Sequence, residues 1–166
     1  MDKLLTADKV LYLDFDGVLH HENVLTHPYR GTYIAAPGRM LFEWMPILEA
    51  LLASHPDVAI VLSTSWVLGR SFDFAKSRLS SSLQKRVIGA TFNHRLIRKD
   101  EFSLLSRGQQ VAEDVSRREP KSWFAIDDEE LGWPAWCRDK LIRTDGAVGI
   151  SNFDVQHSVR KRLDEM

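Results

Sequence analysis

The 166-residue sequence contains a single cysteine, Cys137, and only six prolines and nine glycines. One thiol cannot form an internal disulfide, and it excludes a cysteine-rich zinc site. Chains with so little cysteine are typical of reducing compartments, so we expect a cytoplasmic protein.

Long apolar runs are also missing. The longest, Val58–Leu62, is far shorter than the roughly 20 residues that a membrane-spanning helix needs. The first nine residues, Met1–Lys9, lack the apolar core of a secretory signal. We therefore expect no membrane partner, and no obligate protein partner is evident.

Charge of either sign is not in excess, because 22 basic residues face 23 acidic ones. This balance excludes a generic nucleic-acid coat protein. Acidic residues are nevertheless absent from Phe74 to Lys99, where several lysines and arginines occur. Such a stretch can concentrate an anionic substrate, although a solvated helix face followed by a loop is the more ordinary interpretation.

Short apolar segments, rich in β-forming residues, alternate with helical patterns along the chain. The predicted strands are 10–13, 58–62, 86–91, 123–126 and 140–143. The predicted helices are 40–53, 108–118 and a third that Ser151 opens, with Asp154 as its capping-box partner.

Strands that are apolar throughout predict a parallel sheet covered on both faces. We therefore expect one α/β domain over residues 1–166, a three-layer Rossmann-like fold with a central parallel sheet flanked by helices. Residues 19–37 are long enough for a flap or small insertion but not for a cap domain, and residues 65–107 leave room for only a helix, a weak strand and a loop.

Polar side chains follow three of these strands. Asp14 and Asp16 follow the first strand, Ser63 to Ser65 the second, and Asp127 with Asp128 a later one. Ligands of parallel sheets bind beyond the carboxyl ends of the strands. Four carboxylates at one edge repel each other unless a cation lies among them, and oxygen ligands favour Mg²⁺. Carboxylates, Mg²⁺ and a hydroxyl donor are the equipment of phosphoryl transfer, in which an aspartate can act as the nucleophile.

These strand endings resemble the motifs of the haloacid dehalogenase (HAD) superfamily, which consists mostly of Mg²⁺-dependent phosphatases. Residues 10–19 are similar to its first motif, a strand followed by Asp-x-Asp-Gly. Residues 58–63 and 123–128 are similar to its second and fourth motifs. Residues 62–66 and 144–150 also resemble small bacterial and phage members, some of which are linked to RNA-repair proteins.

The resemblance implies a role for each matching residue. Asp14 would be the nucleophile, and Asp16 the general acid and base. Ser63 would donate a hydrogen bond to the phosphoryl group. Mg²⁺ would be held by Asp14, by the backbone carbonyl of Asp16, and by Asp127 with help from Asp128. Gly17 would let the chain turn into the flap, and we expect Gly17, Thr64 and Lys99 to lie on the substrate side.

The lysine of the third motif has no direct match. The best candidate for the missing cation is Arg107, at the start of a predicted helix, and Lys99 is the second candidate. Which of the hydroxyls of residues 63–65 contacts phosphate also stays open. We interpret His20, His21, Glu22 and His27 as surface or substrate-loop residues, and the tryptophans 66, 123, 133 and 136 as core residues.

The predicted function is therefore a Mg²⁺-dependent phosphomonoester phosphatase that forms an aspartyl-phosphate. Its substrate would be a phosphorylated small molecule or a nucleic-acid end. Two alternatives use the same residue types: a Mg²⁺-dependent nuclease, and a receiver domain of the phospho-aspartate signalling type. A receiver domain should carry its acidic pair after the first strand, whereas here the pair comes late in the sequence.

Overall fold

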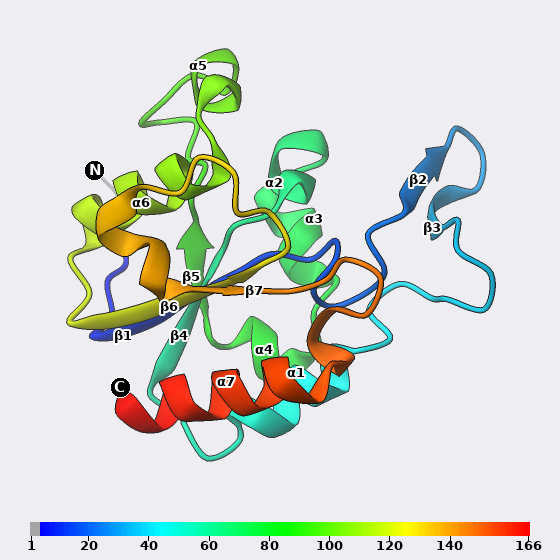
Figure 1. Cartoon of the computed structure of the whole chain (residues 1–166). Helices are drawn as coiled ribbons and strands as arrows, with labels where there is room; N and C mark the ends of the chain where they lie inside the picture. Colours follow the sequence, from blue (N-terminus) through cyan, green and yellow to red (C-terminus); the bar gives the residue numbers. More distant parts are fainter. Residues whose placement is uncertain (1–3) are drawn as a thin grey trace.

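A five-stranded parallel sheet forms the centre of the computed structural model, which describes residues 4–166. Met1 to Lys3, part of the segment judged unlike a secretory signal, lie outside the described residues. The strands are β1 (Lys9–Leu13), β4 (Val58–Leu62), β5 (Val87–Ala90), β6 (Ser122–Asp127) and β7 (Leu141–Arg143), in the order β5-β4-β1-β6-β7. Helices flank this sheet (Figure 1), so the predicted α/β Rossmann-like fold is confirmed.

Alternate residues of β1 pack into two separate cores. Leu11 and Leu13 join the larger core with helices α1 (Met45–Leu52) and α7 (Phe153–Glu165). Val10 and Tyr12 point to the other face, where α6 (Arg107–Arg118) and the 3₁₀ helix η1 (Ala135–Lys140) cover the sheet. Every residue from Val10 to Leu13 is fully buried, which explains the unbroken apolar sequence of this central strand.

An antiparallel hairpin of β2 (Val24–His27) and β3 (Gly31–Ile34) lies within residues 19–37. It projects from the molecule beyond the carboxyl end of β1 (Figure 1). Its base is tied to the body of the protein, because the Glu22 N–H donates to the carbonyl of Gly146 at 2.8 Å.

The segment between β4 and α6 holds more helix than predicted. It contains α2 (Ser65–Gly69), α3 (Phe72–Ser77), α4 (Ser81–Gln84) and α5 (Lys99–Leu104) besides β5. These helices are four to six residues long, too short to show a clear helical period in the sequence. Within residues 4–166, no helix is long and apolar enough to cross a membrane.

Two helix starts were predicted wrongly. The first helix begins at Met45 rather than Met40, because Phe42 adopts a left-handed φ of 56° that interrupts a helix. Pro46 does lie in its first turn. The last helix is capped by Asn152, whose side chain accepts from two backbone N–H groups, while Ser151 belongs to the short 3₁₀ helix η2 (Gly149–Ser151).

Candidate active site at the carboxyl edge of the sheet

The register of the three central strands brings their polar endings together. Leu13 of β1 pairs with Leu62 of β4 on one side and with Ile126 of β6 on the other. The next residues of these strands are Asp14, Ser63 and Asp127. The predicted meeting of the strand ends is therefore a direct result of in-register parallel pairing.

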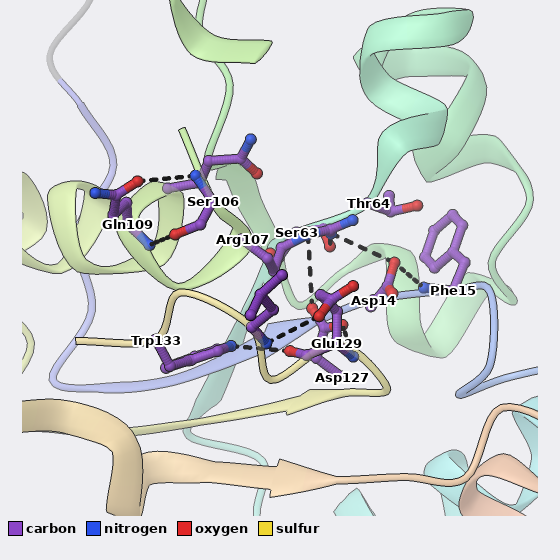
Figure 2. Close-up of polar contacts among 12 residues, drawn as sticks. Asp14, Phe15, Ser63, Thr64, Ser106, Arg107, Gln109, Asp127, Glu129 and Trp133 are labelled. Atoms are coloured by element: carbon purple, nitrogen blue, oxygen red, sulfur yellow. Dashed lines mark hydrogen bonds and ion pairs between the residues drawn. The ribbon is translucent and has the colours of Figure 1, made fainter. Parts of the chain in front are cut away.

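Three carboxylates form the acid trio: Asp14, Asp127 and Asp128 each place one oxygen within 4.8 Å of the others. Asp14 and Asp127 are almost fully buried, and Asp128 is half-buried. Backbone N–H groups fix two of the side chains. Phe15 donates to Asp14 Oδ1 at 2.8 Å, and Glu129 donates to Asp127 Oδ1 at 3.0 Å (Figure 2).

Burial and the negative charges of nearby aspartates raise the pKa values of the acid trio. Burial is the largest cause at Asp14 and Asp127; the charge of Asp16 adds to it at Asp14, and the charge of Asp14 adds to it at Asp127. The same two causes raise the pKa of Asp128 to about 6. Such shifts mark a group of carboxylates that lacks enough positive charge around it.

Arg107 supplies one positive charge to this group. Its Nη1 lies 3.5 Å from Asp14 Oδ1 and its Nε lies 3.7 Å from Asp127 Oδ2. Nη1 also donates to the carbonyl oxygen of Ser63 (Figure 2). Burial by itself would lower the pKa of Arg107, but the surrounding aspartate charges outweigh it and raise that pKa. One guanidinium against three carboxylates still leaves excess negative charge.

The start of α6 is pressed against the loop that follows β6, and this contact places Arg107. Ser106 caps the helix with Gln109 in a capping box, and the Ser106 hydroxyl donates to the Gly132 carbonyl at 2.8 Å. A Cβ atom on Gly108 would lie 2.4 Å from Cα of Trp133, so only glycine permits this approach. The close packing holds the arginine beside the acid trio.

The three hydroxyls after β4 have different surroundings. Ser63 is 2% exposed, and its Oγ has no hydrogen-bond partner among residues 4–166. Thr64 caps α2, where its Oγ1 accepts from the Trp66 N–H at 3.3 Å, and Ser65 is exposed. A buried hydroxyl without a partner costs free energy, so Ser63 is the member of this group that is prepared to donate to a ligand.

The turn after β1 requires glycine at position 17. Gly17 has a φ of 75°, and a Cβ atom there would lie 2.3 Å from Oδ2 of Asp128. The Thr144 hydroxyl donates to the Gly17 carbonyl at 2.6 Å and fixes this turn. Beside it opens a cavity of about 480 Å³, lined by Glu22, Asp128, Arg143, Thr144, Asp145 and Gly146.

Two candidate residues lie apart from the acid trio. The side chain of Asp16 is not a member of the acid trio, and its Oδ1 accepts from His20 and Trp66. Its negative charge still acts on Asp14, whose pKa it helps to raise. Lys99 is exposed at the first residue of α5 and forms no ion pair within the described chain.

Sequence reasoning misplaced some aromatic and histidine residues. His20 is fully buried rather than on the surface, and Trp136 is 63% exposed rather than in the core. Trp66 is buried as predicted, but its indole N–H also bonds to Asp16. The spacing of Asp16 and His20, four residues apart, is the one signal that could have suggested their contact. The bond between Trp66 and Asp16 depends on tertiary structure alone.

Comparison with known proteins identifies the class of fold and then the family. The parallel sheet with its acidic strand endings is that of a HAD domain, and a family model described as "HAD domain in Swiss Army Knife RNA repair proteins" matches residues 10–155. The chain belongs to this family. Searches of curated proteins and of solved structures found no significant match.

Membership of the superfamily implies a phosphohydrolase-type function in general. HAD domains typically use a divalent metal ion, and the buried acid trio suits one. Its ligands are all oxygens, which hard cations prefer, and its unbalanced negative charge would be relieved by a divalent ion.

Proposed function

We propose that this protein is a Mg²⁺-dependent phosphomonoester phosphatase that works through an aspartyl-phosphate on Asp14. The observation that carries the proposal is the acid trio beside Arg107 and the unpartnered Ser63 hydroxyl, all at one sheet edge. When bound to the acid trio, Mg²⁺ would supply positive charge to the phosphoryl oxygens.

In the first half of the reaction, a carboxylate oxygen of Asp14 attacks phosphorus and forms a new O–P bond. The bond from phosphorus to the leaving oxygen breaks, and Asp16 gives that oxygen its proton. The Arg107 guanidinium and the Ser63 hydroxyl donate to the phosphoryl oxygens, which carry the transferring charge.

In the second half, a water molecule attacks phosphorus and loses a proton to Asp16. The O–P bond to Asp14 breaks, which releases inorganic phosphate and restores both carboxyl groups to their starting states. The partly exposed position of Asp16, with 30% of its side chain accessible, suits a group that serves the leaving oxygen and the water in turn.

We propose a phosphate at the end of a nucleic-acid strand as the substrate class. The matched family takes its description from RNA repair proteins, and the cavity beside Asp128 is open rather than enclosed, so a large molecule could present its phosphate there. Oligonucleotides phosphorylated at either end, tested beside phosphorylated metabolites, would separate this substrate class from small molecules.

The test of the proposed reaction is hydrolysis of an artificial phosphomonoester with and without Mg²⁺. We expect Asp14→Asn to lower kcat/KM by at least about 10³-fold, because the amide cannot act as the nucleophile. Full activity in Asp14→Asn would contradict the proposal.

A second measurement separates the phosphatase from a metal-dependent nuclease. A fluoride–metal mimic of phosphate should bind in line with the Asp14 carboxylate of a phosphatase. A nuclease would cleave unphosphorylated oligonucleotides internally and would not need the Asp14 carboxylate as a nucleophile.

A further inference from the structure

The carboxylate of Asp16 is held through one oxygen only. Its Oδ1 accepts from Nε2 of His20 and from Nε1 of Trp66, both at 2.8 Å. Its Oδ2 makes no hydrogen bond within residues 4–166, and the side chain is 30% exposed. The two oxygens of this carboxyl group therefore have different surroundings.

The second bond of His20 determines which of its nitrogens carries the proton. The backbone N–H of Phe42 donates to Nδ1 of His20 at 3.1 Å. Nδ1 must therefore hold a lone pair, and Nε2 carries the proton that is donated to Asp16. His20 is fully buried, and its ring packs edge-on against the Phe42 ring with 4.8 Å between the ring centroids. This packing fixes the direction in which Nε2 donates.

Trp66 reaches Asp16 from the neighbouring strand ending. It lies in α2, three residues after Ser63, and it is 7% exposed. Its ring packs against Phe15 and Phe42 at centroid distances of 5.8 and 5.4 Å. These contacts fix the direction of the indole N–H, so that the second strand ending helps to orient a side chain that follows the first.

We propose that His20 and Trp66 are positioning residues that reserve Oδ2 of Asp16 for the proton exchanged with the leaving oxygen. This inference rests on the proposed phosphatase function. Both lone-pair directions of Oδ1 are occupied by donors, so the proton of the carboxylic acid is carried on Oδ2. Fixing the carboxyl plane then keeps that proton directed at the leaving oxygen.

The proposed step balances as follows. Oδ2 of Asp16 gives its proton to the leaving oxygen as the bond from that oxygen to phosphorus breaks. The electron pair of the broken bond stays on the leaving oxygen, which becomes a hydroxyl. In the second half, Oδ2 takes a proton from the attacking water. His20 and Trp66 keep their own protons throughout.

A pair of substrates with different leaving groups tests this role. Dinitrophenolate leaves without protonation, whereas an alkoxide needs the proton of Asp16. We expect Trp66→Phe to lower kcat/KM for a simple alkyl phosphate by about tenfold, and for dinitrophenyl phosphate by less than about threefold. Asp16→Asn should show the same pattern more strongly.

Trp123→Phe is the matched control, because Trp123 is also 7% exposed but lies at the opposite end of the sheet, where it pairs with Val10. It should leave the ratio of the two kcat/KM values unchanged. A folded Trp66→Phe protein that loses both activities equally, or neither, would overturn the inference. Absence of hydrolysis of both substrates by the parent protein would overturn the proposed function as well.

The bond from His20 is tested separately, so that the proposal does not depend on one variant folding. His20→Leu removes the donor, and His20→Gln keeps a side-chain N–H that can reach Asp16. We expect Gln to restore much of the alkyl phosphate activity that Leu loses, with melting temperatures measured for both. Equal alkyl-to-dinitrophenyl ratios in the two variants would mean that His20 serves packing only.

Discussion

Helix α6 contacts two groups of buried charges, and they are built in opposite ways. Near its end, Asp114 is 1% exposed and accepts from the Tyr12 hydroxyl at 2.9 Å and from Nε of Arg118 at 2.7 Å. Arg118 also donates to backbone carbonyls, including that of Leu5. At its start, Arg107 faces the acid trio.

The two groups differ in whether the protein itself balances the buried charge, and this difference distinguishes a structural group from a ligand-binding one. The Asp114 group satisfies its carboxylate with donors already in the chain, and burial beside Asp114 raises the pKa of Tyr12 so that it stays a donor. The acid trio is left with raised pKa values and excess negative charge. A buried group that the protein does not balance by itself marks the place where a ligand completes it.

The comparison predicts its largest effect at Asp114. Asp114→Asn should lower the free energy of unfolding by about 3 kcal/mol, because it leaves the buried charge of Arg118 without its partner. Asp100→Asn is the control, since the Asp100 pair with Arg98 is exposed and should contribute less than about 1 kcal/mol. Urea denaturation measures both. If both variants lost the same free energy of unfolding, the buried Asp114 group would be no more important to stability than an exposed ion pair.

A smaller effect is expected from the other end of the helix. Arg107→Ala should lower kcat/KM by at least about tenfold, or roughly 1.4 kcal/mol of transition-state stabilisation. Lys99→Ala should stay within about threefold of the parent, because Lys99 is exposed and unpaired among the described residues. The reverse ranking in steady-state kinetics would transfer the role of the cation to Lys99.

Asp127→Asn should weaken the apparent Mg²⁺ affinity by at least about tenfold without lowering the melting temperature of the metal-free protein. The amide removes a buried charge whose pKa is raised by the neighbouring charges of Asp14 and Asp128. Asp145→Asn is the control, because Asp145 lines the same cavity but lies outside the acid trio. A Mg²⁺ titration unchanged in Asp127→Asn would show that the acid trio is not the metal site.

The smallest predicted effect is on pH dependence. The pKa of Asp128 in the folded protein is about 6, against an ordinary value of 3.8. Between these two pH values, the metal-free folded protein therefore holds a proton that the unfolded chain has lost. Its contribution to stability is complete below pH 3.8 and is lost as the pH rises through about 6. Mg²⁺ competes with this proton, so the rise in melting temperature caused by Mg²⁺ should be larger at about pH 7.5 than at about pH 5. An equal rise in melting temperature at both pH values would show that Mg²⁺ does not compete with a proton on Asp128.

Much of this arrangement could be predicted from sequence because it depends on local patterns. The apolar runs predicted the strands, and in-register parallel pairing then aligned Asp14, Ser63 and Asp127. Arg107 could be chosen from the sequence as the candidate cation because it lies at the start of a predicted helix. Its contacts with the acid trio follow from packing at Gly108 and Gly132, which no local pattern encodes.

What could not be predicted depends on side-chain direction and on contacts between distant segments. His20 comes just after a turn, and the sequence around it does not indicate that its ring points inward to meet Phe42. The bonds from His20 and Trp66 to Oδ1 of Asp16, which leave its side chain outside the acid trio, also join segments that are distant in the sequence or buried by tertiary packing. The short helices of residues 65–104 are likewise stabilised by tertiary packing rather than by their own propensity.

The in-register pairing of β1 has a consequence for folding. The partners of Leu13 lie about 50 and about 110 residues later in the chain, so the sheet edge that carries the acid trio consists of contacts between remote segments. Such contacts carry a high loop-closure entropy and form slowly. No fragment that lacks β6 could assemble the acid trio, so the proposed phosphatase activity would report completion of the whole sheet rather than of any one part.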